Sequence, residues 1–176
     1  MQRTVCGRER GTDEVPIAQL HETLRGRDHG GSGMVRGKVA LITGAGTGIG
    51  KGIALAFGQQ GANVVVHYNT SAPGAADVAA QIRGYGSHAM ICQADLREES
   101  AIQSMFQLVV DQFGRIDILV NNSGVTLARS FLDLSVEDWD LVHGINLRGM
   151  FLCSQGGATV QHSVFPPSWR QFLNNA

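Results

Sequence analysis

The sequence predicts an α/β fold in which helices cover both faces of a parallel sheet. Short, almost wholly apolar runs alternate four times with segments of helical composition, and such runs are typical of strands buried on both faces. A glycine-rich turn joins the first run to the first helix. Because this alternation favours right-handed crossovers between parallel strands, we expect a doubly wound sheet with the strand order 3-2-1-4.

The first half of the predicted domain contains two strands and the helix between them. Residues 39–43 form the first apolar run, and the helix after the glycine-rich turn is expected to stop near Gly58 or Gly61. Residues 63–67 form the second run, which is rich in valine. Both runs are short and bounded by glycine or polar residues, which favours strands over helices.

The second half continues the same alternation. Residues 75–83 have helical composition, and residues 88–92 form the third expected strand. In residues 100–113, apolar side chains recur at the three- and four-residue spacing of a helix with one buried face. Gly114 is expected to end that helix, and residues 116–120 form the fourth strand.

The last predicted helix begins after Ser135, where Asp138 three residues later completes a capping box. We expect the paired glycines Gly156 and Gly157 to end it. Residues 156–176 contain a Pro-Pro pair and no strand–helix rhythm. They are therefore predicted to be an irregular tail outside the family pattern, and the sheet is predicted to be truncated after the fourth strand and its following helix.

The domain proper is expected to span residues 37–155. Residues 1–36 mix arginine, glycine and acids without a clear period, which favours a flexible extension. A basic mitochondrial presequence is the alternative, but such peptides are poor in acids, and this segment has several. RNA binding through the arginines of this segment is also disfavoured, because acidic residues lie among them.

Composition and charge exclude several classes of protein. Apolar residues make up 43% of the 176 residues and charged residues 16%, as in globular domains. The net charge of −1 provides no field that attracts nucleic acid or an anionic membrane, and no apolar run is long enough to span a bilayer. Cys6, Cys92 and Cys153 have no metal-like spacing, so we expect reduced thiols in a cytoplasmic protein and no metal site.

The turn after the first strand has the composition of a pyrophosphate-binding loop, with the spacing G-x-x-x-G-x-G. Glycine permits the tight turn and lets a pyrophosphate approach without a Cβ in the way. The helix that follows directs free N–H groups and its positive dipole end at such an anion. A tight turn without a ligand is the alternative interpretation. The residues expected to contact a dinucleotide are Gly44, Gly46, Thr47, Gly48, Ile49 and Gly50.

Four motifs in order resemble the short-chain dehydrogenase/reductase family. Thr43 to Gly50 is similar to its T-G-x-x-x-G-I-G cofactor motif, and Asp95-Leu96 follows the third strand as in the family. Asn121-Asn122-Ser123-Gly124 resembles N-N-A-G, with serine in place of alanine. Asn146 falls at the family's catalytic asparagine. The resemblance covers residues 38 to about 155, extends to 3-oxoacyl reductase-like members, and implies a partial NAD(P)-binding Rossmann domain.

The resemblance also implies roles for these residues. Asp95, with Leu96 beside it, contacts the adenine amino group, and Asn146 holds a water in a proton relay. Taken singly, each has another interpretation: Asp95 as a helix cap or turn residue, and Asn146 as a polar residue bonded within a helix interface. The remaining residues that the resemblance assigns to the cofactor are Asn122, Ser123 and Gly124.

The end of the second strand indicates which nicotinamide cofactor binds. NAD sites often place an acid there to hold the ribose 2′-hydroxyl, but Tyr68, Asn69, Thr70 and Ser71 contain none. Its absence removes the repulsion of a 2′-phosphate, and Asn69, Thr70 and Ser71 offer hydrogen-bond donors. The sequence also resembles NADP-dependent members with H/N-Y-x-x-S here. We therefore predict NADP, with NAD as the alternative.

The family pattern fails at the catalytic residues that the resemblance implies. In the family a Tyr is general acid or base, a Lys four residues later lowers the Tyr pKa, and a Ser orients the substrate carbonyl. The tyrosines are Tyr68 and Tyr85 and the lysines are Lys38 and Lys51. No Tyr-x-x-x-Lys occurs, so only Asn146 is matched.

These observations leave several interpretations of function open. One is an NADP-dependent oxidoreductase of carbonyl or alcohol substrates, active only where another chain or a longer form supplies the missing residues. The second is a catalytically inactive dinucleotide-binding fragment, and the third is a non-functional truncated gene product. In every case the fourth strand is expected to have an open apolar edge that favours self-association.

Overall fold

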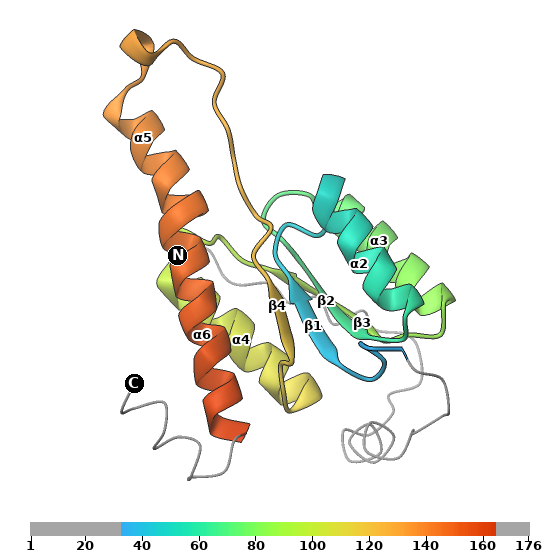
Figure 1. The fold of residues 1–176 in the computed structure, drawn as a ribbon. Helices are drawn as coiled ribbons and strands as arrows, with labels where there is room; N and C mark the ends of the chain where they lie inside the picture. Colours follow the sequence, from blue (N-terminus) through green and yellow to red (C-terminus); the bar gives the residue numbers. More distant parts are fainter. Residues whose placement is uncertain (1–32, 165–176) are drawn as a thin grey trace.

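The computed structural model describes residues 33–164, so the predictions for residues 1–32 and 165–176 lie outside the described part. In this part, a parallel sheet has the order β3-β2-β1-β4, which confirms the predicted α/β class and strand order (Figure 1). The four strands are β1 (Val39–Ile42), β2 (Asn63–Tyr68), β3 (Ala89–Gln93) and β4 (Ile118–Val120).

Helices cover both faces of the sheet, as expected. α2 (Gly48–Gln59) and α3 (Ala72–Gly84) lie on one face. α4 (Glu99–Phe113) and α6 (Met150–Val164) lie on the other, side by side (Figure 1). The sheet is thus the middle layer of three, and its central strands are inaccessible to water.

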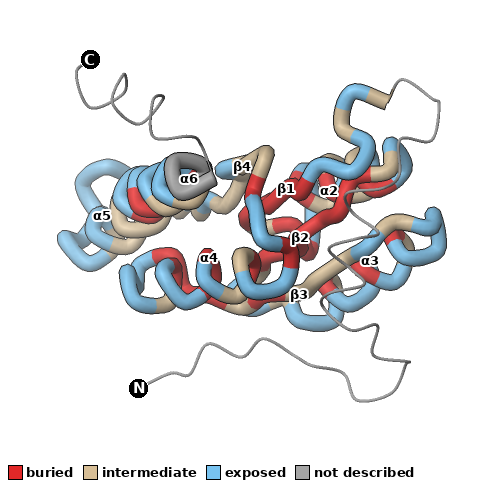
Figure 2. The backbone as a smooth tube through the Cα atoms, turned by 90° about the horizontal axis from the view of Figure 1, so that it is seen from below, coloured by how far each residue is buried: buried red, intermediate tan, exposed pale blue. Residues whose placement is uncertain are grey.

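Alternating side chains of β1 divide the core in two. Val39 and Leu41 belong to the cluster under α4 and α6, whereas Ala40 and Ile42 belong to the cluster under α2 and α3. This follows from the two-residue period of a strand. Buried residues gather in the strands and on the helix faces toward them, and the outer surfaces are exposed (Figure 2).

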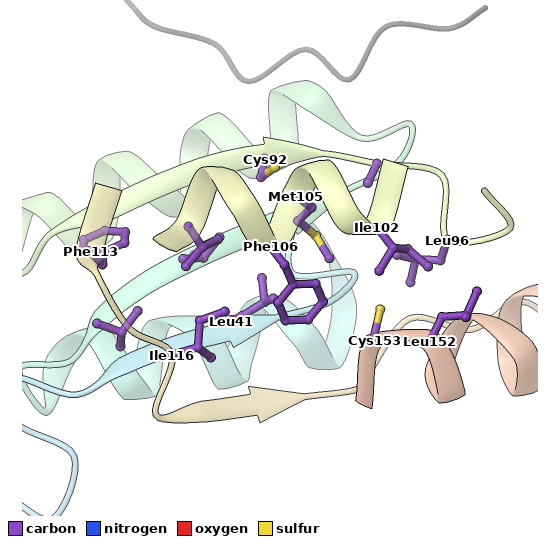
Figure 3. Packing of buried hydrophobic residues seen from close by; sticks show 14 residues of the cluster. Leu41, Cys92, Leu96, Ile102, Met105, Phe106, Phe113, Ile116, Leu152 and Cys153 are labelled. Atoms are coloured by element: carbon purple, nitrogen blue, oxygen red, sulfur yellow. The ribbon is translucent and has the colours of Figure 1, made fainter. Parts of the chain in front are cut away.

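The cluster under α4 and α6 joins the last helix to the sheet. Phe106 and Met105 of α4 lie between Leu41 of the sheet and Leu152 and Cys153 of α6 (Figure 3). These side chains are almost fully buried. Burying a large apolar side chain contributes roughly 1.5–3 kcal/mol, so this packing fixes where α6 lies on the sheet.

Two predicted helix ends are confirmed. Gly114 ends α4 in the left-handed conformation with φ of 72°, and Ser135 starts α5 (Val136–His143) through a capping box with Asp138. A short 3-10 helix, η1 (Phe131–Asp133), precedes it. After α5 the chain continues through a π-helical turn, η2 (Gly144–Gly149), into α6, so that α5 and α6 form one long rod (Figure 1).

The predicted helix end at Gly156 and Gly157 is wrong, because α6 continues to Val164. The glycines serve packing instead of termination. A Cβ added to Gly156 would lie 2.8 Å from the ring of Phe106, and one added to Gly157 would lie 3.2 Å from Leu119. Residues 156–164 are therefore helical and not an irregular tail.

The predicted boundary of the N-terminal extension is also wrong at its last residues. Residues 34–37 form a turn, within which the Arg36 N–H donates to the Gly33 carbonyl at 3.0 Å and the Lys38 N–H to the Val35 carbonyl at 3.0 Å. The Gly37 N–H holds this turn to the domain by donating to the Gly61 carbonyl at 2.9 Å. Val35 packs against the cluster under α2 and α3, which explains why the turn is ordered. Within residues 33–164, no helix has the length and apolarity to cross a membrane.

Candidate functional site

A cavity of about 460 Å³ lies where the strands end at their carboxyl edge. In a doubly wound sheet, ligands bind at this edge. Sequence reasoning named most of the lining and missed His67, Val125 and Ile145. The cavity is lined by Gly44, Gly46, Thr47, Ile49, His67, Tyr68, Asn69, Thr70, Ser71, Asp95, Leu96, Asn122, Ser123, Gly124, Val125 and Ile145.

Three predicted residues lie outside this lining: Gly48, Gly50 and Asn146. Gly48 is the first residue of α2 and has φ of 56°, so it shapes the turn through its backbone. Gly50 is buried, and a Cβ there would collide with the Gly44 carbonyl and the Asn122 amide. Of these two glycines, only Gly50 packs against the turn and Asn122, whereas Gly48 is exposed.

Thr43 ties the glycine-rich turn to the loop after β4. Its hydroxyl donates to the Val120 carbonyl at 3.3 Å and accepts the backbone N–H groups of Asn122 at 2.9 Å and Ser123 at 3.0 Å. The Asn122 side-chain amide also donates to the turn, to the Thr43 carbonyl at 2.9 Å and the Gly44 carbonyl at 3.2 Å. Two cavity walls distant in sequence are thus joined, and the Asn122 amide serves mainly to hold the turn.

The N-terminus of α2 borders the cavity with unpaired backbone donors. Thr47 is its N-cap residue in extended conformation, and no side chain caps the helix. Gly46 lies just before it, where an added Cβ would be 3.1 Å from the Ser71 carbonyl oxygen at the start of α3. A glycine cradle with free N–H groups at a helix start fits the phosphates of a dinucleotide.

Asp95 lines another part of the cavity and is paired with Arg97, which lies outside the lining. The Arg97 guanidinium bonds both Asp95 carboxylate oxygens, with its Nη2 at 2.5 Å, and the Arg97 backbone N–H donates at 3.0 Å. These hydrogen bonds from Arg97, and above all those of its side chain, hold the pKa of the Asp95 carboxyl below its ordinary value. Among the described residues that line the cavity, Asp95 is the only one that carries a formal charge at neutral pH.

The segment after β2 forms the rim without an acid. Asn69 and Thr70 are exposed, and Tyr68 and Ser71 are half-buried. The Gln93 side chain donates to the Asn69 side-chain oxygen at 3.2 Å and so orients its amide. The rim therefore presents hydroxyls and an amide, which suit an anionic group better than carboxylates would.

Asn146 lies in the π-helical turn η2 and holds the loop after β4. Its side-chain oxygen accepts the Val125 N–H at 2.8 Å, and its amide donates to the Val125 carbonyl at 2.8 Å. Arg148 fastens the same turn by donating to the Arg97 carbonyl at 2.9 Å. π-helical turns inside longer helices are frequent at functional sites. The Asn146 side chain is thus bonded to the backbone of Val125, a residue that lines the cavity.

The buried histidine of the lining was missed by sequence reasoning. His67 is 1% exposed in β2, and both ring nitrogens have backbone partners, Gly44 and Ala94. A signal was available, because His67 directly follows three valines in the expected strand, and a polar group in a buried strand must find partners.

A family model described as short chain dehydrogenase matches residues 38–161. The chain belongs to the short-chain dehydrogenase family. Its match extends past residue 155, into the part of α6 that sequence reasoning had assigned to a tail. The family assignment thus agrees with the fold and with the four motifs that line or support the cavity.

Curated short-chain dehydrogenase relatives match about 70% of this chain. It is 43% identical over 123 residues to the short chain dehydrogenase claC of Passalora fulva, covering 70% of this chain and 46% of that protein. It is 42% identical to a 3-oxoacyl-acyl-carrier-protein reductase of Synechocystis sp., covering 67% and 48%. The chain therefore spans about half the length of the curated relatives it matches.

Solved structures give the same picture. A short chain dehydrogenase from Burkholderia cenocepacia in complex with NADP superposes with a TM-score of 0.70 and 38% identity, covering 72% of this chain and 51% of that one. A short-chain type dehydrogenase/reductase from Mycobacterium marinum also has a TM-score of 0.70, with 35% identity and 73% and 52% coverage. The likeness thus covers about half of each of these structures.

Proposed function

We propose that this short-chain dehydrogenase chain binds NADP(H) in the cavity at the carboxyl edge of its sheet. The observation that carries the proposal is the convergence of the glycine-rich turn, the uncapped start of α2 and the acid-free rim on one cavity. Family membership supports a nicotinamide dinucleotide as the ligand.

Each part of the cavity has a proposed contact with the dinucleotide. The glycine-rich turn and the N–H groups at the start of α2 take the pyrophosphate. Asp95 and Leu96 border the adenine, and Ser123 and Gly124 border the nicotinamide half. When bound, the nicotinamide supplies or accepts a hydride.

The proposed preference for NADP over NAD rests on the rim after β2. Asn69, Thr70 and Ser71 provide donors for a 2′-phosphate and include no acid that would repel it. The Asp95 carboxylate, to which the Asn69 side chain is bonded, is paired with Arg97. The Burkholderia cenocepacia relative was crystallised with NADP, which supports the preference by analogy.

We further propose that this chain binds the dinucleotide without turning over a substrate by itself. Tyr68 lies on the rim after β2, Tyr85 ends α3, and Lys51 is paired with Asp77 of α3 at 2.7 Å. Neither tyrosine is followed four residues later by a lysine, so we infer that none of these residues exchanges a proton with a substrate near Ser123. A carbonyl or alcohol oxidoreductase reaction, on a 3-oxoacyl substrate for example, would need a Tyr and a Lys from elsewhere.

The test is a titration of the chain with NADPH and NADH, followed by nicotinamide fluorescence and thermal unfolding. We expect saturable NADPH binding and a raised melting temperature. Asn69→Asp places a carboxylate on the rim with almost no change in shape. It should weaken NADPH by on the order of tenfold through like-charge repulsion and leave NADH nearly unchanged.

Three outcomes would contradict the proposal. Absence of binding by a cooperatively folded chain would refute the dinucleotide site. Equal losses for NADPH and NADH in Asn69→Asp would refute the position of the 2′-phosphate. Oxidation of NADPH by the purified chain with a carbonyl substrate would refute the lack of turnover.

Two further proposals concern association and location. The edge of β4 that faces away from β1 has no strand partner in residues 33–164. We propose that copies of the chain associate there and through the exposed apolar side chains of η1 and α5. We also propose a cytoplasmic location, since the thiols of Cys92 and Cys153 are both buried and burial raises the pKa of Cys153 to about 11. Such thiols fit a reducing compartment.

A further inference from the structure

We propose that His67 is a positioning residue that sets the cofactor turn through its ring nitrogen Nδ1. This inference rests on the proposed dinucleotide site and assigns a role to His67, the first residue of the His-Tyr-x-x-Ser stretch, which was not among the predicted site residues. His67 is part of β2, but its ring reaches both the turn after β1 and the segment after β3.

The hydrogen bonds define the state of the ring. The Gly44 backbone N–H donates to Nδ1 at 3.0 Å, and Nε2 lies 3.0 Å from the Ala94 carbonyl oxygen. Because a backbone N–H can only donate and a carbonyl can only accept, Nδ1 carries no proton and Nε2 carries one. The ring is therefore neutral and held in one tautomer.

The same residue also holds the next residue of the turn. The His67 carbonyl accepts the Ala45 N–H at 2.8 Å, so His67 binds two successive N–H groups, one through its side chain and one through its backbone. Gly44 has φ of 65°, which glycine adopts without strain, so the two bonds select one of several conformations open to this residue. Loss of the Nδ1 acceptor would leave the Gly44 N–H without a partner beside the proposed pyrophosphate position.

The ring also links two sides of the cavity. Gly44 belongs to the turn, and Ala94 immediately precedes Asp95, which lines another part of the cavity. A side chain bonded to both fixes the distance between them. A valine, like the preceding residues of β2, would fill the core at this position but could make neither bond.

Protonation of His67 would remove this function, because a protonated Nδ1 can only donate. Burial lowers the pKa of His67 to about 4. The hydrogen bond to Ala94 and the nearby charge of Asp95 raise this pKa, but burial has the larger effect. Asp95 is paired with Arg97, and the other titratable neighbour is Cys92, opposite His67 on β3. The ring thus stays neutral through the physiological pH range.

The experiment compares two amides in the full chain by calorimetric titration with NADP+ at pH 7. In His67→Asn the side-chain oxygen falls near the Nδ1 position and can still accept from Gly44. In His67→Gln the amide reaches the Nε2 position and leaves Gly44 unpaired. We expect His67→Asn to remain within about threefold of the wild-type Kd and His67→Gln to lose roughly tenfold or more, with similar melting temperatures.

The outcomes separate this inference from the function on which it rests. A folded wild-type chain that binds no NADP+ refutes the proposed function and the inference with it. If wild type binds and the two variants bind equally, the inference alone is overturned. Nitrogen-15 NMR of the wild-type ring keeps the test decisive if both variants unfold: an unprotonated Nδ1 at pH 7 supports the inference, and a proton on Nδ1 refutes it.

Discussion

The buried polar residues of this chain have partners that hold backbone segments together. Thr43 joins the glycine-rich turn to the loop after β4, and His67 joins the same turn to the segment after β3. Asp95 is bonded to Arg97. A buried polar group costs free energy unless it is bonded, so these residues are retained at positions where their bonds shape the cavity.

The first prediction at this scale concerns stability against pH. The pKa of His67 is lowered from 6.5 to about 4 on folding, so the unfolded chain binds more protons between these values. Stability therefore rises with pH in this window, is fully present above about pH 6.5, and is lost as pH falls toward 4. The expected loss is about 3 kcal/mol, measured by urea unfolding at pH 7, 6, 5 and 4.5.

His67→Asn is the matched control, since it has no group that titrates in this window. Carboxylates that titrate in the same range remain in both chains, and the difference between the two pH profiles isolates the histidine. Parallel profiles for wild type and variant would show that His67 is not buried as a neutral ring.

At the scale of elements, close packing decides where helices continue. α6 passes through two glycines because α4 lies too near for a side chain at position 156. The capping box at Ser135 starts α5, and the π-helical turn η2 then brings Asn146 to the loop after β4. Local signals therefore set helix starts here, whereas contacts with α4 and the sheet set the path of the last helix.

The prediction at this scale uses the same substitution at two glycines. Alanine is favoured over glycine in a helix by about 1 kcal/mol. Gly52→Ala in α2 meets no atom within 4 Å, so it should stabilise by about that amount. Gly156→Ala places a Cβ 2.8 Å from the buried Phe106 ring and should destabilise by about 1–3 kcal/mol.

Thermal and urea unfolding of the two variants against wild type provide the measurement. Opposite signs are expected from chemically identical changes, because packing outweighs propensity only at position 156. A stabilising Gly156→Ala would mean that α6 does not pack against α4 in solution as closely as described.

At the scale of the whole molecule, apolar surface is concentrated at the end distant from α2 and α3. Phe131 is 84% exposed and Leu132 is 90% exposed in η1, and Val136 and Trp139 of α5 are also exposed. Figure 1 shows η1 and α5 at the far end of the long rod, away from the sheet. Contiguous exposed apolar side chains of this kind typically mark an interaction surface.

We predict concentration-dependent self-association of the chain in sedimentation velocity. The double substitution Phe131→Ser and Leu132→Ser removes two apolar side chains that do not line the cavity, so it should weaken association without changing the Kd for NADPH. Association that persists unchanged would assign the contact to the β4 edge. A wild-type chain that is monomeric at all concentrations would contradict the prediction.

The sequence by itself determined the strand order, the helices on both faces and the residues around the glycine-rich turn. Apolar runs and their spacing carry this information because burial on one face or both imposes a period on neighbouring residues. The end of α4 at Gly114 and the capping box at Ser135 could also be predicted from the sequence, because the interactions that form them involve residues only a few positions apart.

Only the tertiary structure decided the roles of His67, Arg97, Gly156 and Asn122. Each depends on a partner from another segment: the histidine on Gly44 and Ala94, the glycine on Phe106. Arg97 lies near Asp95 in sequence, but its hold on the carboxylate depends on the fold of that loop. A polar residue or a glycine has many possible partners, and which one it meets is set by how the chain packs rather than by any local pattern.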